Sequence, residues 1–179
     1  MANFRQRHAT FDDFAEYYDL VVGDRATMAA FYRRLVSDRT HSTLELACGT
    51  GTITLAVAQR LVECGGKWEQ CRVVGVDESA EMLRIARAKD ARPEWLLGDM
   101  RAPPVEGIFD LVICCYNTVQ SLLTDDDLAK FFRSVRSIVG PNGVFAFDIM
   151  QPDLQYLSKP PRDYPARAVR IIIPLAAGG

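Results

Sequence analysis

Residues 44–51 read Leu44-Glu45-Leu46-Ala47-Cys48-Gly49-Thr50-Gly51. A short apolar strand with one acidic residue leads into two glycines that stand one residue apart. Glycine lacks a Cβ, so the backbone of such a turn can approach a ligand closely. An apolar-periodic helix is predicted over 52–63, and its first turn presents unpaired N–H groups and the positive end of the helix dipole. This strand–loop–helix unit predicts a cofactor-binding loop, with a generic α/β turn as the alternative.

The residues around the glycines indicate which cofactor the loop selects. A dinucleotide-binding loop reads G-x-G-x-x-G, and Thr54 stands where its third glycine would be. The Glu45 carboxylate would repel a pyrophosphate. It suits a ligand that carries an ammonium group and no phosphate. S-adenosylmethionine has these properties. A nicotinamide dinucleotide does not, so the class of nicotinamide-dependent oxidoreductases is disfavoured.

Residues 45–51 resemble the first motif of the class I S-adenosylmethionine-dependent methyltransferases, which usually carry glycine where this chain has Ala47. The resemblance implies an α/β fold: a Rossmann-like doubly wound sheet of order 3-2-1-4-5 with an N-terminal helical lid. It also implies S-adenosylmethionine as the cofactor and S-adenosylhomocysteine as the product. The residues of this loop assigned to the cofactor are Glu45, Ala47, Cys48, Gly49 and Gly51.

A second acid-tipped strand, Arg72-Val73-Val74-Gly75-Val76-Asp77, follows one helix later. A carboxylate there can accept hydrogen bonds from ribose hydroxyls, each contributing ~1.5–3 kcal/mol; the alternative is a charge at the next helix N-terminus. The resemblance gives Asp77 the ribose role, with Glu78 beside it and Ser79 as the N-cap of the helix. Met82 packs on the adenine by resemblance, and an ordinary core position is its alternative.

Two further strands complete the expected cofactor site. Residues 95–100 form a strand that ends in Gly-Asp. By resemblance, the Asp99 carboxylate accepts a hydrogen bond from the adenine amino group, and the Met100 backbone N–H meets the ring. Residues 109–118 read as a buried strand that runs into a loop over the cofactor, where the Cys115 carbonyl faces the cofactor ammonium by resemblance. Each motif is weak alone, but their order along the chain is specific.

Aromatic and acidic residues before the first strand predict helical cover, with a second helix from about Arg25 to Ser37. Related enzymes often carry a Tyr-Asp pair in such a lid. Residues 18–24 and 114–118 resemble the branch that contains glycine N-methyltransferase and related small-molecule N-methyltransferases. Tyr17 is assigned to cofactor binding and, with Asn117, to orienting the acceptor; amphipathic packing is the alternative for Tyr17. The arginine that holds the cofactor carboxylate in that branch matches Met28 here, so Arg25 is not assigned this role.

The alternation of strands and helices predicts one domain in three parts. These are a lid over 1–40, a cofactor-binding core over 41–150 and a short irregular segment over 151–179. Strands are predicted near 43–47, 72–76, 94–97, 109–114 and 143–149, and helices near 52–63, 79–89 and 125–138, the last with a capping box at Thr124 and Asp127.

The C-terminal part is shorter than the family pattern, whose sheet ends in an antiparallel pair of strands. We expect these last two strands to be lacking, and a truncation, a frameshift and a strand exchange between chains are the competing explanations. The fifth strand would then expose a sticky edge. We expect this edge to be covered by the apolar run at 168–173 or by a second copy of the chain.

Composition excludes several other classes of protein. A net charge of −2 without a basic stripe argues against nucleic-acid binding. No segment reaches the ~20 apolar residues of a membrane span. The five cysteines form no C-x-x-C pair, and only His8 and His41 accompany them, so we expect no metal site and a reduced, cytoplasmic protein.

The absence of a His, Cys or Ser catalytic cluster fits methyl transfer from a sulfonium. This in-line displacement depends on positioning more than on acid–base groups, and well-oriented approach can supply ~7–11 kcal/mol of the barrier. The expected function is methyl transfer to a small-molecule acceptor, most simply an amine nitrogen. The alternative is a module that binds the cofactor but lacks catalytic competence.

Overall fold

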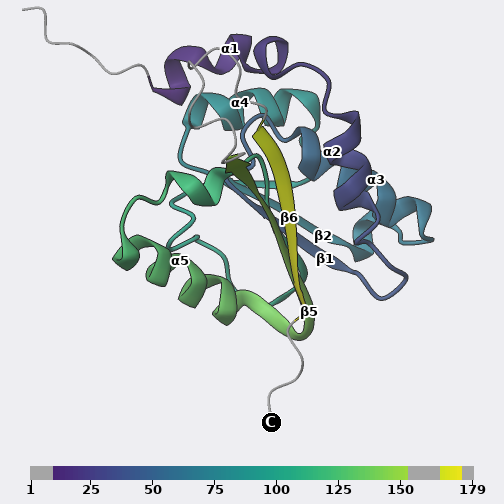
Figure 1. Ribbon diagram of the computed structural model, residues 1–179. Helices are drawn as coiled ribbons and strands as arrows, with labels where there is room; N and C mark the ends of the chain where they lie inside the picture. The colour runs from purple at the N-terminus through teal and green to yellow at the C-terminus, as the bar shows by residue number, and fades with distance from the viewer. Residues whose placement is uncertain (1–9, 153–165, 175–179) are drawn as a thin grey trace, which may run out of the picture.

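The computed structural model describes residues 10–152 and 166–174 (Figure 1). Its helices are α1 (Phe11–Val22), α2 (Ala26–Arg33), α3 (Thr52–Glu63), α4 (Ala80–Lys89) and α5 (Asp125–Ile138), with 3-10 turns η1 (Trp68–Gln70) and η2 (Thr118–Ser121). Its strands are β1 (Ser42–Leu46), β2 (Arg72–Asp77), β3 (Glu94–Leu97), β4 (Phe109–Cys114), β5 (Val139–Pro152) and β6 (Ala166–Pro174).

The strands form a six-stranded sheet of order β3-β2-β1-β4-β5-β6. The pairs β1–β2, β1–β4, β2–β3 and β4–β5 are all parallel. This confirms the Rossmann-like α/β fold and the order 3-2-1-4-5 for the first five strands. The strand order reverses at β1, between β2 and β4. The carboxyl ends of the strands at such a switch point are where this class of sheet binds its ligands.

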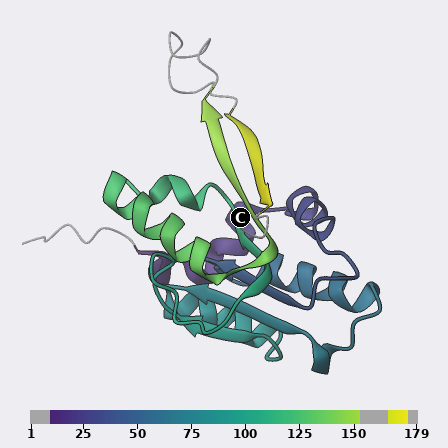
Figure 2. The same cartoon turned by 90° about the horizontal axis from the view of Figure 1, so that it is seen from below.

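Strand β6 adds an antiparallel partner to β5, in a register that pairs Phe145 with Ile173 and Ile149 with Val169. The prediction that the 168–173 run covers the fifth-strand edge is therefore confirmed. Strand β6 occupies this edge in the structure, and association of two copies of the chain stays a prediction. One antiparallel strand is present where the sequence predicted that the last two strands would both be lacking. Strand β4 pairs with β5 only as far as Phe147, so β5 and β6 continue beyond the sheet as a two-stranded arm (Figure 2).

Helices cover both faces of the sheet (Figure 1). Side chains alternate along a strand, so Leu44 and Leu46 of β1 pack with Phe131 of α5 in one core cluster. On the opposite face, Leu111 of β4 packs with Ile53 of α3 in a second cluster that also includes Tyr32 of α2. The chain between β3 and β4 contains no helix, and this leaves the residues after β3 free to form part of the cavity described below.

Periodicity and capping residues account for the helix positions. Helix α3 buries Ile53, Val57 and Leu61 at four-residue spacing, which is one face of a helix. Helix α5 begins after Thr124, whose hydroxyl oxygen accepts a hydrogen bond from the Asp127 N–H at 3.1 Å. Ser79 caps α4 in the same way. The helices predicted over 52–63 and 125–138 have these bounds in the structure.

Candidate functional site

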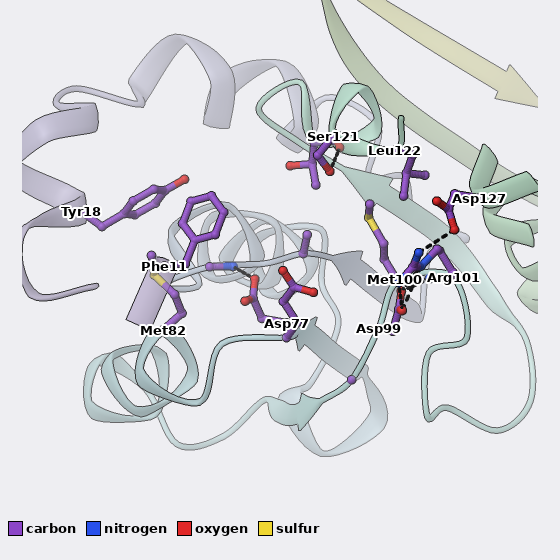
Figure 3. A pocket seen from close by; sticks show the side chains of 15 residues that line it. Phe11, Tyr18, Asp77, Met82, Asp99, Met100, Arg101, Ser121, Leu122 and Asp127 are labelled. Atoms are coloured by element: carbon purple, nitrogen blue, oxygen red, sulfur yellow. Dashed lines mark hydrogen bonds and ion pairs between the residues drawn. The ribbon is translucent and has the colours of Figure 1, made fainter. Parts of the chain in front are cut away.

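A cavity of about 290 Å³ opens at the carboxyl ends of β1, β2 and β3 (Figure 3). The lid helix α1 contributes Phe11 and Tyr18. The remaining lining residues are Ala47, Gly49, Asp77, Glu78, Met82, Gly98, Asp99, Met100, Arg101, Thr118, Ser121, Leu122 and Asp127. The cavity thus runs from the lid, past the glycine loop, to η2 and the first turn of α5.

The structure brings about half of the assigned residues together in this cavity. Those that line it are Ala47, Gly49, Asp77, Glu78, Met82, Asp99 and Met100. Those that lie outside its lining are Tyr17, Glu45, Cys48, Gly51, Cys115 and Asn117. The roles of all these residues toward a ligand stay predictions. The hydrogen bonds that each residue makes determine which of its atoms a ligand can still contact.

The two glycines of the loop have left-handed backbone conformations, with φ of 53° at Gly49 and 76° at Gly51. A Cβ at Gly49 would lie 3.6 Å from the Tyr18 ring, on the cavity side. A Cβ at Gly51 would lie 2.4 Å from the ring of Trp95 in the core. Gly49 therefore leaves room in the cavity. Gly51 instead allows α3 to begin against Trp95, and Cys48 packs in the same core cluster as Trp95.

Asp77 anchors the glycine loop from the end of β2. Its Oδ2 accepts a hydrogen bond from the Gly49 N–H at 2.7 Å, and its Oδ1 accepts one from the Ser79 N–H at 2.9 Å. Burial raises the pKa of this carboxyl despite these two bonds. A carboxylate offers about four acceptor positions, so roughly two remain available to a ligand in the cavity.

In the lid, Tyr18 lines the cavity, whereas Tyr17, the tyrosine assigned from the sequence, does not. Tyr17 is 63% exposed. Adjacent residues of a helix point in directions about 100° apart, so only one of the pair can face the core. The sequence signal that favours Tyr18 is its place directly before Asp19, which makes these two residues the Tyr-Asp pair.

Arg25, which sequence reasoning left unassigned, is buried beside the cavity with 8% exposure. Its guanidinium carbon lies 4.8 Å from the ring centre of Tyr18 and 5.4 Å from that of Tyr116. Its Nη2 lies 2.9 Å from Asp19 Oδ1 but has no hydrogen-bond partner with suitable geometry among the described residues. The arrangement holds a cation, with N–H donors to spare, next to the glycine loop.

Acidic residues one helical turn apart hold α1 on the core. The Ser79 hydroxyl donates to Asp12 at 2.5 Å, Arg84 pairs with Glu16, and Lys89 pairs with Asp19 at 2.6 Å. Asp12, Glu16 and Asp19 share one face of α1, and their partners are the N-cap and two side chains of α4. The lid therefore lies against α4 in this structure.

The loop after β4 is held by Asp148, a fully buried residue of β5 that the sequence analysis did not single out. Its carboxylate accepts hydrogen bonds from the Tyr32 hydroxyl at 2.7 Å and from the Tyr116 and Asn117 N–H groups at 3.0 Å each. Tyr116 and Asn117 both have φ near +60°, which non-glycine residues adopt at some cost. An acid inside the apolar run at 144–149 was the available sequence signal.

The atoms that resemblance assigns near the cofactor ammonium have other surroundings here. The Cys115 carbonyl accepts hydrogen bonds from the Thr118 hydroxyl at 2.6 Å and from the Thr118 N–H at 3.4 Å, which engage both of its lone pairs. The Asn117 Oδ1 atom is buried and unpartnered within the described part of the chain. Both assignments stay predictions.

Glu45 does not line the cavity and contacts α3 instead. It is 3% exposed and accepts a short hydrogen bond from the Thr54 hydroxyl. Burial raises the pKa of its carboxyl to about 7, from a usual value of 4.5. The folded protein therefore holds this proton more tightly than the unfolded chain does. The stability that Glu45 contributes is complete below pH 4.5 and is lost as the pH rises through 7.

We expect Glu45→Gln to be more stable than the wild type at pH 8 by about 3 kcal/mol and almost equally stable at about pH 4, because glutamine resembles the protonated acid. Urea unfolding at the two pH values measures this. A stability difference that is the same at both pH values would show that Glu45 does not titrate in this way.

The family described as "Methyltransferase domain" matches residues 43–143, which span the loop, the acid-tipped strands and β4. The chain belongs to this family.

Similar methyltransferases come from several bacteria. Trans-aconitate 2-methyltransferase from Azoarcus sp. (strain BH72) is 34% identical over 178 residues, 94% of this chain and 64% of that protein. The dTDP-3-amino-3,6-dideoxy-alpha-D-glucopyranose N,N-dimethyltransferase of Streptomyces fradiae is 31% identical over 74% of this chain and 51% of that protein. The chain therefore spans only part of the length of these methyltransferases.

A crystal structure of an S-adenosylmethionine-dependent methyltransferase from Clostridium acetobutylicum is similar in fold, with a TM-score of 0.61. The two proteins are 28% identical, and the match covers 83% of this chain and 60% of the Clostridium chain. Within residues 10–152 and 166–174, no helix has the length and apolar character to cross a membrane. No group of three acidic, histidine or cysteine side chains in that part of the chain is placed to hold a metal ion.

Proposed function

We propose that the cavity binds S-adenosylmethionine and that the chain transfers its methyl group to a small-molecule acceptor, at an amine nitrogen. The observation that supports this proposal most strongly is the position of Asp77. Its buried carboxylate lines the cavity beside Gly49, accepts a hydrogen bond from the Gly49 N–H and keeps further acceptor positions free. The similar solved structure from Clostridium acetobutylicum is that of an S-adenosylmethionine-dependent methyltransferase, which supports the same ligand here.

Each part of the cavity wall carries side chains that suit one part of the cofactor. Asp77 would hold the ribose hydroxyls, and Met82 and Met100 would flank the adenine. Arg25 would meet the cofactor carboxylate, since its guanidinium is buried beside the glycine loop with unused N–H donors. Tyr18 would cover the methionine end from the lid. The bound cofactor supplies the methyl group, and the chain supplies orientation and exclusion of water.

The charge of the cavity favours an amine over an anionic acceptor. Its lining includes four carboxylates, those of Asp77, Glu78, Asp99 and Asp127, against the one guanidinium of Arg101. Trans-aconitate, after which the Azoarcus relative is named, is a tricarboxylate and would be repelled by this charge. The amino group of a sugar such as the one after which the Streptomyces relative is named would not be repelled. The cytoplasmic location and the division into three parts stay predictions.

A second candidate, cofactor binding without catalysis, is favoured by one observation. Neither Tyr17 nor Asn117, the two residues assigned to orienting the acceptor, lines the cavity. Incubation with radiolabelled S-adenosylmethionine and a panel of amines, amino sugars and carboxylic acids separates the two candidates. Label in an amine supports the proposal; label in the acids alone contradicts the nitrogen assignment, and cofactor binding without transfer supports the second candidate.

Arg25→Ala should weaken binding of S-adenosylhomocysteine about 10- to 100-fold, the loss expected for one charge-assisted hydrogen bond. Methylthioadenosine lacks the carboxylate, and its affinity should change little. Calorimetric titration of both ligands measures the difference. Arg33→Ala is the matched control, because Arg33 lies on α2 and pairs with Glu63 instead. An equal loss for both ligands would remove Arg25 from the carboxylate site.

A further inference from the structure

One guanidinium bridges two carboxylates at the end of the cavity opposite the lid residues Phe11 and Tyr18 (Figure 3). Arg101 Nε lies 3.0 Å from Asp99 Oδ1 and 2.9 Å from Asp99 Oδ2, and its Nη2 lies 2.6 Å from Oδ2. From its other edge, Nη1 donates to Asp127 Oδ1 at 2.6 Å. This bridge ties the loop after β3 to the first turn of α5.

Each carboxylate is also held from a second direction. The Arg101 backbone N–H donates to Asp99 Oδ1 at 2.8 Å, and the Thr124 hydroxyl donates to Asp127 Oδ2 at 2.8 Å. The four contacts to Asp99 come from three N–H donors, because the Nε–H is shared between its two oxygens. An ionised carboxylate only accepts hydrogen bonds, so a ligand group that meets Asp99 must supply an N–H donor and not a carbonyl.

The guanidinium also favours the ionised form of Asp99, because its hydrogen bonds lower the pKa of this carboxyl. Without Arg101, the ionised carboxylates of Asp99 and Asp127 would repel each other, and Asp99 would lose the contacts that fix its orientation. A carboxylate that is free to turn away from the base would distinguish an amino group from an oxo group less well.

We propose that Arg101 is a positioning residue that determines base specificity. By fixing Asp99 in one orientation as a pure acceptor, it makes the cavity take a purine with a 6-amino group and reject one with a 6-oxo group. This inference rests on the proposed function, in which the cavity binds an adenine nucleoside.

The chain offers a matched control in Arg92. Asp90 and Arg92 form the same two-residue chelate, with Nε at 3.0 Å from Oδ1 and 3.1 Å from Oδ2. Neither residue lines the cavity, and Arg92 contacts no second carboxylate among the pairs found in the described chain. Removing Arg92 therefore has the same local chemical effect at a site that cannot affect base recognition.

The test is calorimetric titration of S-adenosylhomocysteine and of its 6-oxo analogue, S-inosylhomocysteine, into the wild type, Arg101→Gln and Arg92→Gln. The wild type and Arg92→Gln should prefer the 6-amino ligand about tenfold or more, the size of one charge-assisted hydrogen bond. In Arg101→Gln this preference should largely disappear, while binding of the 6-oxo ligand is retained.

The outcomes separate this inference from the function on which it rests. A wild type that binds neither ligand contradicts the proposed function. A wild type that binds both equally, an unchanged preference in Arg101→Gln, or an equal loss for both ligands overturns the role of Arg101. If Arg101→Gln does not fold by circular dichroism, Arg101→Lys replaces it. Lysine can contact one carboxylate but cannot chelate, and an unchanged preference there overturns the proposal as well.

Discussion

Replacing Asp148 with alanine should lower the free energy of unfolding by about 3–5 kcal/mol, the largest stability effect that we expect from a single side chain. The substitution leaves three donors without their partner: the Tyr32 hydroxyl and the N–H groups of Tyr116 and Asn117. Each buried donor without a partner costs ~1–3 kcal/mol. Because water can reach the half-buried loop and replace part of the lost hydrogen bonding, the total loss for the three donors falls below the sum of their largest individual costs.

Urea unfolding of Asp148→Ala measures this loss. The control is Tyr32→Phe, which removes one of the three bonds and leaves the loop held; it should cost only ~1 kcal/mol. The left-handed pair Tyr116–Asn117 depends on Asp148, so cofactor affinity should fall in Asp148→Ala and persist in Tyr32→Phe. A stability loss below 1 kcal/mol in Asp148→Ala would show that the loop is held by other contacts.

Replacing Asp77 with alanine should have the largest effect on binding. The affinity for S-adenosylhomocysteine should fall about 100-fold, because the ligand loses charge-assisted bonds to its ribose and Gly49 loses its anchor. Equilibrium titration of the folded variant measures this loss.

Asp110 provides the control for Asp77 at the opposite end of the sheet. Its carboxylate accepts hydrogen bonds from the His41 and Ser42 N–H groups at 2.8 and 2.9 Å, much as Asp77 accepts from Gly49 and Ser79. Asp110→Ala should therefore reduce stability without reducing affinity. Equal affinity losses in the two variants would mean that Asp77 acts only through the fold.

The parts of the fold that depend on local pattern were predictable from the sequence. Apolar periodicity and caps such as Thr124 specify α3 and α5, and short apolar runs with an acid at or near their carboxyl end specify β1, β2 and β3. The length of β5 was underestimated. Its first residues pass through a Gly-Pro-Asn-Gly turn signal, and its last ones are extended by pairing with β6, a contact distant along the chain.

The parts of the site that depend on tertiary contacts were not predictable. Tyr17 and Tyr18 are chemically alike, and the docking of α1 decides which one faces the cavity. Arg25 and Asp148 acquire their surroundings from segments up to 116 residues away. Glu45 lies where the motif predicts in sequence, but the alternation of side chains along β1 turns it toward α3, whereas Asp77 at the tip of β2 reaches the cavity.

The most direct test of the central claim is calorimetric titration of S-adenosylhomocysteine into the folded wild-type protein, with NADH as the comparison ligand. We predict saturable binding of one S-adenosylhomocysteine per chain, strongly reduced in Asp77→Ala, and no binding of NADH. Folded protein that takes up no S-adenosylhomocysteine, or that binds NADH in its place, would contradict this account.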